Sequence, residues 1–438
     1  MPLPGLNRRD LPASTRAAQA LWLVVCCTAA AGSPDRAFPG AMGWAASTPG
    51  GRGGKIIRVT TLDRDGRGSF AEAVRAAGPR IIVFEVGGVI DLDRQRVTVR
   101  EPYVTIAGQT APSPGVTLIR GGLSIQTHDV IVQHIRVRPG EAGAAKKSGW
   151  EVDGIATSAA HDVIVDHCSC TWATDENLSV SGPRFDGDTV EQWRQGTSHR
   201  VTLSNNIIAE GLANSTHQKG RHSKGTLVHD NATQIAIVGN LYAHNWDRNP
   251  LFKGGARGIV VNNYIYNPAR AAIHYALVSG EWDDRPYVTG QMALVGNVLE
   301  YGPSTASNVA LMRCQRKGPC EVFMEDNCIL AGTTEHGSLL RIDEEMPDQD
   351  RCLVETRPLW PDGMDVLPVE AVREHVLDNA GARPWDRDEV DRRIVAEVRA
   401  GAGQIIDSEQ DVGGYPVVEP THAPFDAGEW DLDTMTRR

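Results

Sequence analysis

One short sequence pattern recurs along the middle of the chain. Each copy has alternating aliphatic residues, then Asn or His, then another aliphatic pair. The copies begin about 24 to 38 residues apart, a range of spacings that indicates stacked structural units. They are VIVQHIRV from Val130, VIVDHCSC from Val163, VTLSNNII from Val201, IAIVGNLY from Ile235, IVVNNYIY from Ile259, MALVGNVL from Met292 and VFMEDNCI from Val322.

A single unit of this kind cannot bury its apolar face, whereas a stack of units can. The alternation predicts a strand with one buried face, and the Asn or His after it can turn the chain and stack on its neighbours. The pattern therefore predicts an all-β protein, a right-handed parallel β-helix or solenoid. The 45 glycines and 25 prolines suit many short strands joined by turns. A β-sandwich is the disfavoured alternative, because hairpin signals such as Asn-Gly are scarce.

Helices are predicted on both sides of the repeats. In SFAEAVRAAGPR, Ser69 and Glu72 form a capping box, which predicts a helix that closes the N-terminal end of the coil stack. LPVEAVREHVLDNAG and DRDEVDRRIVAEVRAGAG predict two short helices near the C-terminus. We expect a β-helix catalytic domain over residues 34–345 and a tail over 346–438 whose helices pack on the solenoid.

The start of the chain is typical of an export signal. It has a basic opening, an apolar stretch from Ala17 to Val25 and small residues before Ser33. We expect residues 1–33 to be a signal peptide, which predicts a secreted or periplasmic protein. The apolar stretch is too short to span a bilayer, so no stable membrane insertion is expected. A first buried helix is the alternative, and the signals for twin-arginine export or a lipoprotein anchor are weak.

Six cysteines remain after the predicted signal peptide. An exported chain can use them in disulfides. Cys314 with Cys320 and Cys328 with Cys352 are two pairings that the sequence allows, among the 15 or so connectivities open to six cysteines. A zinc site is less favoured, because no CxxC motif accompanies them.

Three further segments indicate a function. They are AFPGAMGWAASTPGGRGGKIIRVTTLDRDGRGSFAEAVRAAG, VIVDHCSCTWATDENLSV and RNPLFKGG. Together they resemble bacterial pectate lyases of polysaccharide lyase family one, from about Ala37 to beyond Asn327. The resemblance implies cleavage of polygalacturonate by β-elimination on calcium-bound substrate, in a cleft along one face of a β-helix.

The resemblance also assigns roles to the basic residues. It places the catalytic base at Arg248 and a residue that grips a uronate carboxylate at Lys253, where arginine is more usual. Either Lys219 or Lys224 of the preceding loop is implied to bind uronate as well. An ordinary guanidinium has a pKa above about 12 and is rarely a base, so nearby cations would have to lower that pKa, which predicts activity favouring alkaline pH. The alternative is a surface arginine paired with Asp247.

The net charge of -11, with the basic residues confined to one zone, argues against binding to nucleic acid. An acidic polysaccharide is the expected partner, and we expect a monomer.

Calcium is the cofactor that the resemblance implies. Calcium takes about six to eight oxygen ligands, so carboxylates from neighbouring coils should face one another. We expect Asp153, Asp175 and Glu176 to bind it, because they lie one predicted coil apart. The family has a second aspartate where Ser179 stands, which leaves the calcium affinity open. The alternative is that Asp175 and Glu176 are turn residues that cap a strand.

Other functions remain open at this point. A polygalacturonase-like glycoside hydrolase would need two or three convergent carboxylates. A lyase for another uronate polymer and a non-catalytic carbohydrate-binding β-helix are further alternatives. His217 and His222 are interpreted as loop or core residues, because their spacing does not favour a metal site. Asp166 and His167 are interpreted as support for a turn inside the stack.

Overall fold

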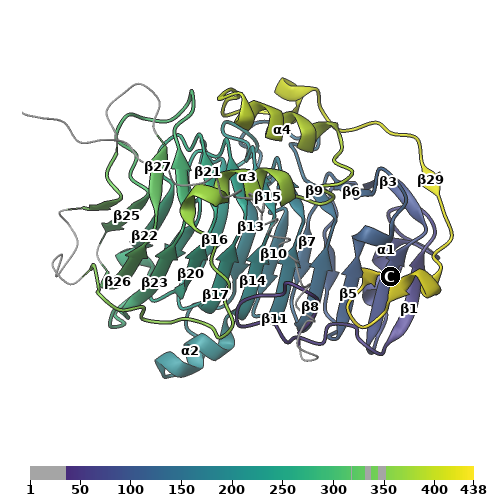
Figure 1. Ribbon diagram of the computed structural model, residues 1–438, viewed down its shortest axis with the longest axis horizontal. Coiled ribbons are helices and arrows are strands. Elements are labelled where there is room, and N and C mark those ends of the chain that lie inside the picture. The colour runs from purple at the N-terminus through teal and green to yellow at the C-terminus, as the bar shows by residue number, and fades with distance from the viewer. Residues whose placement is uncertain (1–35, 317, 331–336, 344–351) are drawn as a thin grey trace, which may run out of the picture.

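The computed structural model describes residues 36–438, except 317, 331–336 and 344–351. The predicted signal peptide and the predicted domain boundary at residue 345 lie outside the described residues. The described chain forms a parallel β-helix whose coils follow one another along the long axis of the molecule (Figure 1). Each full coil contributes one strand to each of three sheets, which confirms the predicted fold class.

The three sheets run the length of the solenoid. Sheet 1 contains β1 (Lys55–Val59), β2 (Arg80–Phe84), β5 (Val104–Ala107), β8 (His128–Gln133), β11 (His161–Asp166), β14 (His199–Ser204), β17 (Thr233–Val238), β20 (Arg257–Val261), β23 (Gly290–Val295) and β26 (Cys320–Glu325). Sheet 2 contains β4 (Val97–Val99), β7 (Leu123–Ile125), β10 (Ile155–Ser158), β13 (Glu176–Ser181), β16 (Lys224–Val228), β19 (Leu251–Lys253), β22 (Ile273–Leu277), β25 (Met312–Arg316) and β28 (Leu340–Ile342). Sheet 3 contains β3 (Val86–Asp91), β6 (Val116–Ile119), β9 (Arg136–Arg138), β12 (Ser169–Thr171), β15 (Ile207–Ala209), β18 (Leu241–Ala243), β21 (Tyr264–Tyr266), β24 (Val298–Glu300), β27 (Cys328–Leu330) and the antiparallel edge strand β29 (Thr421–His422). A separate small hairpin joins β30 (Trp430–Asp431) and β31 (Thr436–Arg437).

The seven sequence repeats correspond to the junctions between sheet 1 and sheet 3. In each repeat the alternating aliphatic residues form the sheet 1 strand, and the last residues of the repeat fall in the sheet 3 strand. The inward-facing residues of the sheet 1 strands, such as Val163 and Val201, are buried in one continuous core inside the solenoid. The register keeps equivalent residues in line, since Val163 pairs with both Val130 and Val201.

A ladder of buried asparagines stabilises these junctions, as the repeat pattern predicts. Asn206 donates from its side-chain amide to Asn240 at 2.9 Å, and Asn240 donates in the same way to Asn263 at 2.9 Å. Asn263 and Asn297 continue the ladder at 3.1 Å. Each amide also bonds backbone groups of its own or the adjacent coil, so the polar groups of the turn are satisfied without water.

Short helices close and cover the solenoid. The capping helix α1 (Phe70–Arg75) begins after Ser69, whose Oγ accepts from the amide of Glu72 at 3.1 Å, as predicted. The sequence pattern did not predict α2 (Val190–Gly196), which lies outside sheet 1 in Figure 1. The predicted C-terminal helices are α3 (Val369–Asn379) and α4 (Glu389–Arg399), and their apolar faces pack on the outer side of sheet 3.

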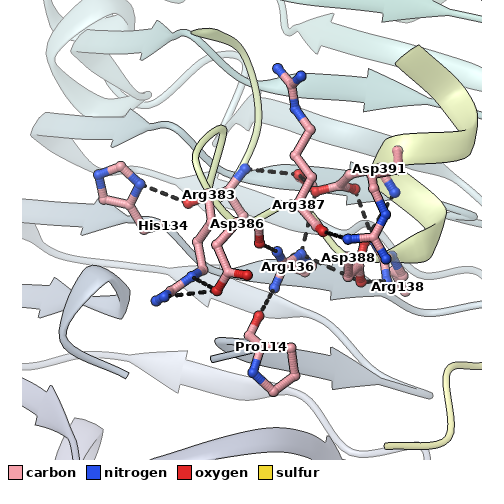
Figure 2. A network of polar contacts seen from close by, with 12 residues as sticks. Pro114, His134, Arg136, Arg138, Arg383, Asp386, Arg387, Asp388 and Asp391 are labelled. Atoms are coloured by element: carbon pink, nitrogen blue, oxygen red, sulfur yellow. Dashed lines mark hydrogen bonds and ion pairs between the residues drawn. The ribbon is translucent and has the colours of Figure 1, made fainter. Parts of the chain in front are cut away.

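A buried ion-pair network fixes the C-terminal tail to sheet 3 (Figure 2). Arg136 and Arg138 of β9 both have fully buried side chains. Arg138 pairs with Asp388 at 2.6 Å and with Asp391 at 2.8 Å, and Arg136 lies 3.3 Å from Asp391. Ser169 of β12 donates to Asp391 at 2.7 Å. The tail therefore neutralises two arginines that would otherwise be buried without a counter-charge.

The cysteines do not adopt the pairing of Cys328 with Cys352 that the sequence allows. The Sγ atom of Cys352 lies 3.1 Å from that of Cys320 and 3.1 Å from that of Cys314, and all three side chains are buried. Cys328 lies on β27, in register with Val298. Cys352 therefore approaches Cys314 and Cys320 rather than Cys328. None of the described helices is both long and apolar enough to cross a membrane.

Candidate active site

Apart from Lys219, the predicted site residues lie on or just before four neighbouring strands of sheet 2. Asp153 precedes β10, Asp175 and Glu176 stand at the start of β13, and Lys224 begins β16. Arg248 precedes β19 in the next coil. Since β10, β13, β16 and β19 are consecutive neighbours in the sheet, the structure stacks these residues along one end of the strands.

The three carboxylates converge. Oxygen atoms of Asp153, Asp175 and Glu176 lie within 4.8 Å of one another. The two oxygens of Asp153 accept hydrogen bonds from the backbone amide of Glu176 at 3.1 Å and from the Ser179 hydroxyl at 2.6 Å. Ser179 thus holds Asp153 in place. Acidic oxygens gathered in this way suit a hard divalent cation, which prefers oxygen ligands.

Burial and neighbouring charges shift the pKa values of these acids. Burial and the nearby charge of Asp175 raise the pKa of Asp153 to about 7, against a lowering effect of the Ser179 hydrogen bond. Burial alone would also raise the pKa of Asp175, but the hydrogen bond from His222 and the nearby charges of His222, His217 and Arg248 lower it overall. One acid is therefore poised to change charge near neutral pH, while its neighbour stays ionised.

Arg248 lies directly against this cluster. Its NH1 contacts Oε1 of Glu176, and about a quarter of its side chain remains exposed, at 24%. Burial lowers the pKa of Arg248, and the charges of Asp175 and Asp153 offset only part of that effect. Asp247, the alternative partner for Arg248 in the sequence, instead accepts from Lys224 at 2.7 Å. The guanidinium is thus held among acids with its pKa below the usual range.

The remaining lysines differ in their surroundings. Lys253, at the end of β19, lies 3.1 Å from Asp230 and contacts Glu281. Lys219 is exposed in the loop that precedes β16. Of the two loop lysines, Lys224 is the one that lies in the stack beside Arg248, because its neighbour in register is Glu176 and it is bridged to Asp247.

The sequence prediction did not assign two groups of residues to the site, and it interpreted His217 and His222 as loop or core residues. Asp230 and Glu281 pair with two cations, Lys253 and Arg184. Arg184 lies 3.0 Å from Asp230 and 2.9 Å from Glu281. His222 donates from Nε2 to the carboxylate of Asp175 at 2.8 Å, and His217 stacks on His222. These partners come from loops and a short 3-10 helix between the strands, where no repeat pattern marks them. The available signal was the density of charged residues and histidines in the 210–223 loop.

A pocket lies elsewhere on the molecule. A pocket of about 690 Å³ is lined by His134, Trp385, Phe425 and Trp430 among others, and none of the predicted site residues line it. The chemistry of the stacked charges on sheet 2 is therefore separate from this pocket.

The chain has the fold of a parallel β-helix protein, and solved structures have the same fold. The cedar pollen allergen jun a 1 aligns with a TM-score of 0.52 at 16% identity, covering 78% of this chain and 92% of the other. A pectate lyase structure described for its substrate specificity and anti β-elimination mechanism aligns with a TM-score of 0.50 at 13% identity, covering 79% and 97%. At such identities these matches support the fold alone.

Sequence comparison identifies the family. Probable pectate lyase C of Emericella nidulans is 32% identical over 404 residues, which cover 91% of this chain and 83% of that protein. Probable pectate lyase C of Aspergillus flavus is 33% identical over 396 residues, covering 89% and 84%. No family model matches the chain. The chain belongs to the pectate lyase family and is an enzyme of the lyase class.

Proposed function

We propose that this protein cleaves polygalacturonate by calcium-assisted β-elimination, with Arg248 as the base. The observation that carries the proposal is the position of Arg248, whose guanidinium lies against the carboxylate cluster with its pKa lowered by burial. A base of lowered pKa beside a cation site is the arrangement that proton abstraction next to a carboxylate requires.

In the elimination step, Arg248 acts as the base on the sugar ring. Its unprotonated guanidine takes the proton from C5 of a galacturonate residue, the C4–C5 double bond forms, and the bond from C4 to O4 breaks. The leaving O4 takes a proton from solvent, so the products are a shortened chain and a chain with an unsaturated end. The acids around Arg248 hold the side chain in position through the contact with Glu176.

Asp153, Asp175 and Glu176 would hold the calcium ion in this proposal. Their converging oxygens fit a hard cation, and burial together with the charge of Asp175 raises the pKa of Asp153, so a bound cation would favour its ionised form. A calcium ion bound there would neutralise the uronate carboxylate and so make the C5 proton more acidic. Glu176 would hold the ion while it also contacts Arg248.

Lysines would bind the other carboxylates of the polymer. We assign this role to Lys253 and Lys224, with Lys219 as an exposed contact at the edge. Lys253 is already paired with Asp230 and Glu281, so a substrate carboxylate would replace Glu281, the more exposed partner at 40%. A single ammonium makes a less directional contact than the forked hydrogen bonds of arginine. We also propose that the enzyme is exported through its first 33 residues and acts as a monomer.

A substrate panel tests the proposal. The protein is incubated with polygalacturonate, methylated pectin and glucuronan, each with calcium or with a chelator, while ultraviolet absorbance and new reducing ends are followed together. Elimination predicts equal growth of both signals on polygalacturonate with calcium and neither with chelator. Reducing ends without absorbance would show hydrolysis, and activity on another polymer alone would reassign the substrate.

A further inference from the structure

A further pocket lies on the outer side of sheet 1, beside α2 (Figure 1). It has a volume of about 560 Å³, and the residues around it include Trp44, Arg194, Arg200, Arg257, Leu359 and Trp360. Arg194 lies on α2, and Arg257 begins β20, directly after the turn that follows β19. None of the predicted site residues lines this pocket, so it is separate from the carboxylate cluster on sheet 2.

Two of the arginines face this pocket without a counter-charge. Within the described part of the chain, the guanidinium of neither Arg194 nor Arg257 forms an ion pair or a hydrogen bond, and the Nε atom of each is buried without a partner. Arg200, by contrast, pairs with Asp162 at 2.5 Å. Glu191 is the one acid among the described residues that line the pocket, and it pairs with neither arginine. The pocket therefore presents two guanidiniums that still lack an acceptor.

The two guanidiniums also lie close enough to repel each other. Burial lowers the pKa of Arg194 and the charge of Arg257 lowers it further, while Glu191 raises it in part. Burial likewise lowers the pKa of Arg257, against the charge of Glu321. Like charges that are partly removed from water favour the approach of an anion. Since the chain as a whole carries a net charge of -11, this positive pocket runs against the overall charge and indicates an anionic ligand.

The rest of the lining suits a sugar ring. Trp44 and Trp360 are half-buried and pack against the apolar outer side of sheet 1. Gln195 and Gln234 also line the pocket, and their amides can donate to and accept from hydroxyl groups. Apolar and aromatic walls with a few polar groups are typical of pockets for small molecules, and this pocket is larger than an inorganic anion needs. A sugar ring that carries a carboxylate matches both the walls and the charge.

We propose that this pocket is a second binding site for uronate sugars, in which Arg194 and Arg257 bind the carboxylate while Trp44 and Trp360 contact the ring. The choice of a uronate among anionic sugars rests on the proposed function. The site takes no part in the elimination. It holds the polymer to the enzyme at a second point, which raises the effective concentration of substrate at the cleavage site.

Hydrogen–deuterium exchange of the full-length wild-type protein in chelator, titrated with trigalacturonate, tests this proposal. We expect trigalacturonate to protect the backbone amides of α2 and of the start of β20, whereas the neutral sugar maltotriose should protect neither. Arg194→Gln and Arg257→Gln should each weaken the binding measured at α2 by roughly 10–100-fold, because a hydrogen bond to a charged group is lost. Arg67→Gln, at an exposed arginine near α1, should leave it unchanged.

Thermal unfolding provides a second measurement on the same variants. Glutamine keeps the aliphatic part of the side chain and removes the repulsion, so Arg194→Gln and Arg257→Gln should each have a Tm at least as high as that of wild type. A clearly lower Tm in both would contradict the absence of a counter-charge.

Three outcomes of the exchange experiment would overturn the proposal. The first two are no protection of α2 by trigalacturonate, and equal affinity in wild type and both arginine variants. The third is protection by inorganic phosphate but not by trigalacturonate, which would make the pocket a site for an inorganic anion. Failure of the proposed function is distinguishable from these outcomes, because it appears as a lack of unsaturated product on polygalacturonate with calcium, whether or not trigalacturonate protects α2.

Discussion

The guanidinium of Arg248 contacts the carboxylate of Glu176, although 72 residues separate them in the sequence. The stacking of coils brings them together, because Glu176 is in register with Lys224 of β16 and Lys224 is bridged to Asp247. The same register places the carboxylates of two coils and the basic side chains of two later coils at the same end of the sheet 2 strands.

The pH dependence of catalysis should follow the protonation of Arg248. Burial lowers its pKa, and Asp175, Asp153 and Glu281 raise it part of the way back. The unprotonated form is the base, so kcat/KM should rise as pH increases through the alkaline range. Glu281→Gln removes one of the raising charges, and we expect the profile to move to lower pH by up to about one unit. Asp283→Asn, at a 75% exposed side chain in the same segment, serves as the control. An unshifted profile in Glu281→Gln would contradict this account of the pKa.

Asp153 should make the stability of the metal-free protein depend on pH. Its pKa is raised from 3.8 to about 7, first by burial and then by Asp175. Between these values the folded protein binds more protons than the unfolded chain, so the free energy of unfolding falls as pH rises through this window. Asp153→Asn removes this dependence of the free energy of unfolding on pH. In chelator, we expect the variant to have a higher Tm than wild type at pH 8, and we expect this difference to shrink as the pH falls to about 4.

Thermal unfolding followed across this pH range checks the prediction, and added calcium provides its counterpart. Calcium should raise the Tm of wild type at pH 8 but have little effect on Asp153→Asn, which lacks a charged ligand. Parallel Tm curves for the two proteins in chelator would show that Asp153 titrates normally.

Ser179 should limit the calcium affinity. Its hydroxyl donates to Asp153 at 2.6 Å and supplies no charge. Ser179→Asp adds a carboxylate at this point, and we expect the calcium dissociation constant to fall by roughly tenfold, because affinity grows with ligand charge. The extra repulsion should also lower the Tm of the metal-free variant. Isothermal titration calorimetry measures the affinity, with Ser179→Ala as the comparison that removes the hydroxyl alone. Weaker binding in Ser179→Asp than in wild type would place the ion elsewhere.

The buried ion pairs of the tail should matter for stability and not for chemistry. Asp391 has a fully buried side chain and pairs with Arg136 and Arg138. Asp391→Ala leaves these arginines short of a counter-charge, and we expect a loss of about 3–5 kcal/mol in the free energy of unfolding. Asp378→Ala removes an exposed pair with Arg399 and should cost less than about 0.5 kcal/mol. Denaturant unfolding measures both, and equal effects would mean that the network is not important for the tail.

The repeated strands could be predicted from the sequence because their signal is local. Each copy carries its own alternation and its own turn residue, and Asn240 and Asn263 stack simply because the copies are in register. The helices α1, α3 and α4 were predictable for the same reason, since caps and apolar faces lie within a few residues of one another.

The contacts between distant segments could not be predicted in this way. Nothing in VIVQHIRV, or in the sequence just after it, shows that Arg136 and Arg138 are buried, because the tail that neutralises them comes about 250 residues later. His217 and His222 lie in a loop with no periodicity, so nothing in the local sequence shows that they fold over Asp175. Cys352 lies beside Cys314 and Cys320, and the spacing of the cysteines in the sequence does not determine this arrangement.

The initial rate of ultraviolet absorbance increase on calcium-loaded polygalacturonate, compared between wild type and Arg248→Ala, tests the central claim. Arg67→Ala, at an exposed arginine near α1, is the matched control and should keep the wild-type rate. With Arg248 as the base, the alanine variant should lose at least about a hundredfold in rate while it retains its fold and its affinity for the polymer. A folded Arg248→Ala variant that forms unsaturated product at the wild-type rate would contradict the account.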